Sequence, residues 1–129
     1  MYLPVLLAEY GEVIEADLQR YYGVDLLGLY KGRITPRRVM ALISGLPPGS
    51  AFHRARGGPA SWSDEVAAVK EAGYRLESTL ISVNGGKQLP QRPEPPPVGW
   101  RVKAAEQEAR LVARLSRHKA RTAGGSTTR

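Results

Sequence analysis

The residues that could carry acid–base or metal chemistry are few and scattered. The two histidines, His53 and His118, stand far apart in segments of different character, and the chain has no cysteine. Neither an HExxH motif nor an aspartate cluster offers the spacing of metal ligands. Asp64 and Glu65 are adjacent, so on a helix they point to different faces and are typical of helix-dipole partners rather than an acid/base pair. The sequence therefore predicts no metal site.

Signatures of nucleotide binding and of nucleophilic catalysis are also missing from the sequence. The glycine pairs at 57–58 and 85–86 lack the spacing of phosphate-binding loops. The serines are plentiful, but none lies in a GxSxG nucleophile elbow. We therefore expect a protein that works by binding, with no cofactor and no enzyme activity.

Aromatic residues and arginines are the better candidates for function. Stacked aromatic rings among arginines could bind single-stranded nucleic acid. In a small domain, however, most aromatic side chains are needed to form the core, and we favour that interpretation. The candidate partner-binding residues are Tyr21, Tyr22, Arg37, Arg38, Phe52, Arg54 and Trp62.

The net charge of +7 is concentrated at one end of the chain. Residues 1–86 are neutral, whereas residues 101–129 carry eight Lys or Arg against Glu106 and Glu108. Such a basic block could bind phosphates or an acidic protein surface, or it could be a solvated tail that aids solubility. The candidate contacts of this block are Arg110, Arg114, Arg117, Lys119 and Arg121.

The spacing of apolar residues predicts that a small all-α domain over residues 1–86 holds the candidate partner-binding side chains. A first amphipathic helix begins near Pro4 and ends at Gly23, with Asp17 and three glutamates on its polar face. Asp25 could cap one short turn, which ends at Gly32. The longest apolar run, residues 3–8, is too short to span a bilayer, so we expect a soluble, intracellular protein.

Two further helix starts can be recognised from capping residues. Thr35 followed by Pro36 begins a helix that stops at the prolines after Leu46. Its first turn carries Arg37 and Arg38, where the helix dipole disfavours positive charge, so we expect an acidic partner, with Asp25 as first choice. Ser63 begins another helix. Whether its last residues, Thr79–Val83, are helix or strand is open, and we favour helix.

Proline and charge divide the rest of the chain. Residues 87–100 contain five prolines between 90 and 97, which favours an extended spacer or a peptide that docks on an aromatic groove. Residues 101–129 predict a basic helix over 101–121 and a disordered tail over 123–129. A domain of about 85 residues buries only a modest fraction of its surface, so a partner or a homo-oligomer could supply further burial.

The residues of the first part also resemble a known family. The pattern comprises Tyr22-Gly23-x-Asp25-Leu26, Gly32-x-Ile34-Thr35-x-Arg37-Arg38-Val39, Leu42-Ile43-x-x-Leu46-Pro47-x-x-Ser50-Ala51-x-x-Arg54-Ala55, and a tryptophan before the next helix. It resembles tail assembly chaperones of actinobacterial tailed phages, often the downstream member of a frameshifting pair. The resemblance covers about residues 10–85 and rests on helix and turn residues, not on a reactive motif.

This resemblance implies a helical protein that binds the tape measure protein and tail tube subunits during assembly in the host cytoplasm. It also implies that the protein is absent from the mature virion. If the chain is normally part of a longer frameshift product, Met1 need not be its only natural start. Two alternatives stay open: a nucleic-acid-binding protein that uses the basic tail, and a structural tail or connector protein.

Overall fold

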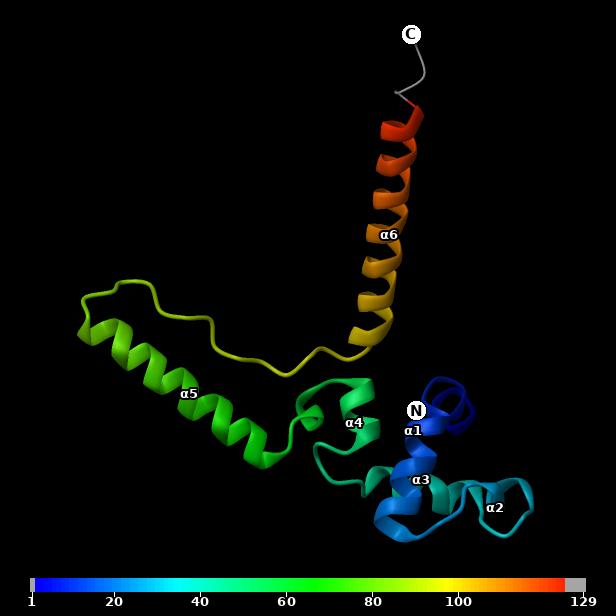
Figure 1. Ribbon diagram of the computed structural model, residues 1–129. Coiled ribbons are helices and arrows are strands. Elements are labelled where there is room, and N and C mark those ends of the chain that lie inside the picture. The colour runs from blue at the N-terminus through cyan, green and yellow to red at the C-terminus, as the bar shows by residue number, and fades with distance from the viewer. Residues whose placement is uncertain (1, 125–129) are drawn as a thin grey trace. The chain divides into compact units, whose positions relative to one another are not determined.

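The computed structural model describes residues 2–124, with the side chains described as far as Lys119. These residues form helices joined by turns and one irregular segment, and none of them forms a strand (Figure 1). The predicted all-α class is confirmed, and residues Thr79–Val83 are helical as favoured. The chain divides into two compact units, residues 1–98 and 99–129.

Helix α1 (Leu3–Tyr22) begins and ends as its sequence predicts. Pro4 lies in the first turn, where no intrahelical donor is needed. Gly23 caps the other end with φ +62°, and its N–H donates to the Gln19 carbonyl at 3.1 Å. This left-handed conformation suits glycine because it has no Cβ. The helix is kinked at Tyr10, whose φ of −129° is not helical.

Helices α2 (Leu27–Tyr30) and α3 (Pro36–Ser44) follow, each with the predicted side-chain contact at its start. The Leu27 N–H donates to Asp25 Oδ1 at 2.8 Å, and the Arg38 N–H donates to Thr35 Oγ1 at 3.3 Å. The predicted ion pair between Asp25 and Arg38 is wrong, because Arg37 and Arg38 have no acidic partner among the described residues. Both arginines are exposed, so water and salt screen their repulsion from the helix dipole.

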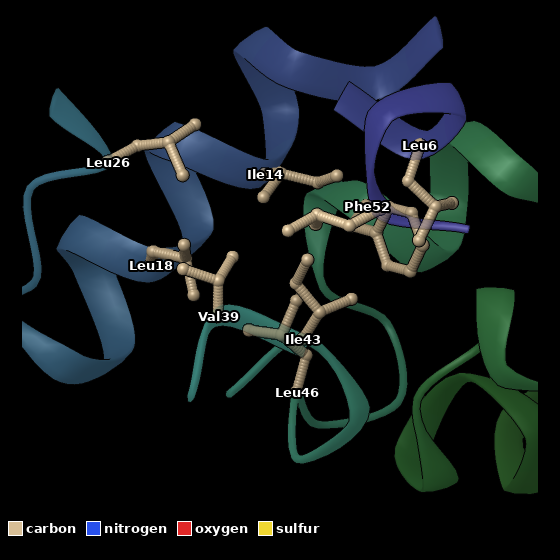
Figure 2. Close-up of a cluster of buried hydrophobic side chains, with 9 residues drawn as sticks. Leu6, Ile14, Leu18, Leu26, Val39, Ile43, Leu46 and Phe52 are labelled. Atoms are coloured by element: carbon tan, nitrogen blue, oxygen red, sulfur yellow. The ribbon is translucent and has the colours of Figure 1, made fainter. Parts of the chain in front are cut away.

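Helix α4 (Ala51–Arg56) and the 3₁₀ turn η1 (Pro59–Ser61) complete the compact part of the first unit. Figure 2 shows apolar side chains from α1, α3 and α4 meeting in one cluster around Phe52. Tyr10 packs edge-on against Phe52, with 5.7 Å between ring centroids. The buried apolar residues are Leu3, Leu6, Ile14, Leu18, Leu26, Val39, Ile43, Leu46, Phe52 and Ala55.

The prediction that Asp17 lies on the polar, outward face of the first helix is wrong. Its side chain is only 2% exposed. The carboxylate accepts hydrogen bonds from the Ala51 N–H at 3.2 Å and from the Phe52 N–H at 2.7 Å. N–H groups at the start of a helix have no acceptor within the helix itself, and the helix dipole there also favours a negative charge. Asp17 therefore joins α1 to α4 through the core.

Helix α5 (Asp64–Val83) begins at Ser63, whose hydroxyl accepts from the Val66 N–H at 3.4 Å. No residue in its described length is buried, so α5 adds nothing to the core. The irregular segment after it, residues 86–97, returns along the helix and is attached at two points. Arg92 pairs with Glu71 at 3.1 Å, and the Gly58 N–H donates to the Pro96 carbonyl at 2.7 Å.

The second unit consists of α6 (Trp100–Gly124). Its side chains from 101 to 119 are exposed apart from the half-buried Ala113. The helix includes residues 123 and 124, which were assigned to the disordered tail. The rest of that tail, residues 125–129, lies outside the described residues.

Candidate functional site

An apolar groove lies between the first turns of α1, the end of α2 and the first half of α3. Its volume is about 830 Å³. Leu7 from α1, Leu29 from α2 and Met40 from α3 are half-buried against the core and line it. We call this feature the α1–α3 groove. Its lining residues are Tyr2, Leu3, Pro4, Leu7, Ala8, Leu29, Tyr30, Pro36, Arg37 and Met40.

Two exposed tyrosines and one arginine border the α1–α3 groove. Tyr2 is 73% exposed and Tyr30 is 74% exposed, so both rings offer apolar area that nothing in the unit covers. Arg37 is the only charged residue in the described lining, and it lies in the first turn of α3, where the helix dipole is positive. This combination suits an apolar partner that brings an acidic group to Arg37.

The groove continues along α1 into a smaller hollow of about 190 Å³. Leu7 and Tyr30 border both spaces, and Leu26 and Leu27 add further apolar lining. Glu15 lies at this end, so the two ends of the combined surface carry opposite charges. An elongated partner would therefore meet a positive charge from Arg37 at one end and a negative charge from Glu15 at the other.

The seven predicted partner-binding residues do not form one platform. Phe52 is 2% exposed and belongs to the core, the alternative favoured for the aromatic residues. Tyr21 and Tyr22 lie at the end of α1, and the Tyr22 hydroxyl faces Gly45 at the end of α3. Trp62 is half-buried before α5, with the Lys70 ammonium 5.1 Å from its ring centroid.

Of the predicted arginines and tryptophan, three do not line the groove: Arg38, Arg54 and Trp62. Arg38 and Arg54 are exposed but do not line it, and only Arg37 does. The sequence did not identify Tyr2 or Leu7 as binding residues. Tyr30 is one of the aromatic residues considered for a platform beside the arginines, and it lines the groove together with Arg37.

A second exposed apolar surface runs along α5. Val69 is 71% exposed, Leu76 64% and Val83 79%, and they lie on one side of the helix with Val66 and Leu80. We call these five residues the α5 stripe. The opposite side carries Glu71 and Ser78, which are half-buried where the irregular segment returns. Exposed apolar side chains gathered on one side typically mark an interaction surface.

Helix α6 gathers positive charge on one face. Arg110, Arg114 and Arg117 follow one another at helical spacing and line the same side of the helix. Lys119 lies on a different side by the same spacing, and the side chain of Arg121 lies outside the described residues. The predicted basic contacts thus include three arginines that could contact a single linear ligand.

Within residues 2–124, no group of histidine, cysteine or acidic residues has the arrangement of a metal site. In the same part of the chain, no helix is both long enough and apolar enough to cross a membrane. The described surfaces with a distinctive character are thus the α1–α3 groove, the α5 stripe and the basic face of α6.

Comparison with known proteins finds relatives among phage tail assembly proteins. The chain is 29% identical over 102 residues to the tail assembly protein Gp25 of Mycobacterium phage L5, and equally to that of Mycobacterium phage D29. The chain resembles phage tail assembly proteins. The resemblance predicted from its helix and turn residues is therefore confirmed.

The match has a limited extent. It covers 72% of this chain but 36% of each relative, so the chain spans about a third of the length of the curated proteins it matches. No protein-family model matches the chain, and no solved structure matches it.

Proposed function

We propose that this protein is a non-enzymatic tail assembly chaperone that binds a helical segment of another tail protein in the α1–α3 groove. The similarity to the two tail assembly proteins supports the role in assembly. The groove supports the mode of action, because it is an apolar surface on a small core that the described residues of its own unit leave uncovered. The proposed clients are the tape measure protein and the tail tube protein.

The shape and chemistry of the groove favour an amphipathic helix as the bound segment. Such a helix would place an apolar row against Leu7, Leu29 and Met40, as helix-in-groove complexes do. An acidic residue at one end of the row would meet Arg37, and a basic residue at the other end would meet Glu15. We expect a tape measure protein to expose such rows until the tail tube surrounds it.

Two adjacent arginines provide a matched test of this proposal. Arg37 and Arg38 both lie in the first turn of α3 and are both exposed, but only Arg37 lines the groove. Glutamate at either position has the same favourable interaction with the helix dipole, so both variants should fold equally well. The assay is co-expression of the full chain with the tape measure protein, followed by measurement of the soluble fraction and of co-purification.

We expect Arg37→Glu and Tyr30→Ala each to weaken co-purification of the tape measure protein by about tenfold, as loss of a central contact does. Arg38→Glu should behave like the wild type. Equal loss in Arg37→Glu and Arg38→Glu would argue for a general charge effect, and no loss in either groove variant would reject the groove as the binding site.

The basic face of α6 favours a second candidate function, binding to nucleic acid. Arg110, Arg114 and Arg117 could contact successive phosphates, and the affinity would then fall steeply as salt concentration rises. If the full chain binds DNA or RNA tightly in low salt and does not change the solubility of the tape measure protein, this function replaces the chaperone. Under the chaperone proposal, the protein acts in the host cytoplasm and leaves no copy in the mature virion.

A further inference from the structure

We propose that the α5 stripe is the contact between two copies of this chain, which pair as an antiparallel coiled coil. This inference is independent of the α1–α3 groove and of its client. It starts from an unpartnered helix: α5 has twenty residues, and none of them is buried. In proteins most of the stability of an amphipathic helix comes from packing of its apolar face, and the apolar face of α5 stays exposed among the described residues.

The spacing along α5 is that of a coiled-coil seam. Val66, Val69, Gly73, Leu76, Leu80 and Val83 follow one another at alternating steps of three and four residues. This spacing is the a and d pattern of the heptad repeat, which places all six positions on one narrow line along the helix. The face opposite the seam includes Glu71 and Ser78, and Glu71 is held by Arg92 of the irregular segment. The chain thus covers the back of α5 and leaves the seam bare.

Gly73 leaves room for a large side chain of a partner at the middle of this seam. Glycine inside a helix is unfavourable relative to alanine. Nothing within the chain requires it here, because a Cβ built at Gly73 would meet no atom within 4 Å. In an antiparallel pair centred on the helix, Gly73 of one copy faces Leu76 of the other, so a small residue meets a large one twice.

The same register pairs the other seam residues and the flanking charges. Val66 faces Val83 of the second copy, and Val69 faces Leu80. Lys70 and Glu77 flank the seam on one side, and in this register Lys70 of each copy lies beside Glu77 of the other. Opposite charges at such flanking positions set the orientation of coiled coils. The Lys70 ammonium already contacts the Trp62 ring, which places Trp62 at the border of the proposed interface.

The first test measures the mass of the full chain in solution by sedimentation or by light scattering over a range of concentrations. We expect a dimer whose dissociation constant rises by about tenfold or more in Leu80→Glu. Ala68→Glu is the matched control, because it adds the same charge to an exposed position of α5 away from the seam. A wild-type chain that stays monomeric, or a dimer that Leu80→Glu leaves intact, would overturn the proposal.

The second test determines the direction of the two helices, and the absence of natural cysteine makes it direct. Under oxidation, the double variant Val66→Cys Val83→Cys should form a disulfide-linked dimer, whereas each single variant should not. Disulfide dimers of the Val83→Cys single variant would instead show a parallel pair and overturn the antiparallel register.

Discussion

The contact between Asp17 and the start of α4 makes a strong prediction about stability. Replacing Asp17 with alanine leaves the N–H group of Phe52 without an acceptor in the buried core, and that of Ala51 without one at a half-buried position. A hydrogen bond to a charged group contributes about 1.5–3 kcal/mol, and loss of a helix N-cap costs about 1 kcal/mol. The two bonds share one carboxylate and are not additive, so we expect a loss of about 2–4 kcal/mol in the free energy of unfolding.

A conservative variant separates the hydrogen bonds from side-chain packing. Asp17→Asn keeps the size of the side chain and one acceptor oxygen, so it should lose about half as much stability, roughly 1–2 kcal/mol. Glu12→Ala is the control, since it removes an exposed carboxylate from the same helix. Urea unfolding of the full chain, followed by circular dichroism, gives the free energies. Hydrogen exchange at the N–H groups of Ala51 and Phe52 then reports whether the loss is located at α4.

One result would refute this reasoning. If Asp17→Ala and Glu12→Ala lose the same small amount of stability, the buried carboxylate does not hold α4 against α1. Faster exchange throughout the chain with no preference for α4 would have the same meaning. A loss near the upper end of the range could unfold so small a core entirely, because total stabilities are about 5–15 kcal/mol. In that case Asp17→Asn is the variant that decides.

Two further predictions concern the turn before α4 and the irregular segment. Gly49 has φ +80°, and a Cβ there would lie 2.9 Å from Ser63 Cβ, so Gly49→Ala should lower the free energy of unfolding in urea by about 1–3 kcal/mol. Gly23→Ala is the control, because Gly23 has φ +62° but no atom within 4 Å of an added Cβ. An equal loss of stability in both variants would exclude a role for the clash. Hydrogen bonds from Arg75, and to a lesser degree from Arg92, lower the pKa of Glu71 below its ordinary value of 4.5. The contact therefore stabilises the fold above that pH, and this stabilisation is lost as the pH falls through the lowered pKa. The Arg92 Nε–H signal in NMR should show the segment attached at neutral pH and released in acid, and a signal that does not change with pH would contradict this.

Local features of this fold were readable from the sequence because short-range chemistry determines them. Thr35 and Ser63 each accept the predicted hydrogen bond at a helix start, and Gly23 ends α1 in the left-handed conformation. Each of these contacts joins residues within four positions of one another. No knowledge of the rest of the fold is needed to predict them.

Asp17 could not be assigned in this way, because its partners lie 34 and 35 positions along the chain. On a helical wheel it belongs with the acidic residues of α1, and only the approach of α4 buries it. Arg38 shows the reverse error. The unfavourable interaction of Arg38 with the helix dipole predicted an acidic partner, but water and salt screen that interaction at an exposed side chain, so no partner is needed.

The α1–α3 groove was hidden for a similar reason. Leu7, Leu29 and Met40 come from three different helices, and each reads as an ordinary core residue in its own segment. The α5 stripe illustrates what periodicity can and cannot show. Its spacing is that of an apolar helix face, but the same spacing occurs whether that face meets the core of its own chain or another molecule.

The two uncovered apolar surfaces differ in ways that argue for two different partners. The groove is concave, is built from three elements and has unlike charges at its ends, so it can select a helix by shape and polarity. The α5 stripe is a straight seam that, with Gly73 and the flanking Lys70 and Glu77, matches its own reversed sequence. A dimer formed through α5 would carry two grooves. A long client that presents several apolar rows could then bind both at once, and its release would require both to open. Self-association through one surface would thereby strengthen the hold on a client at the other without any additional contact to it.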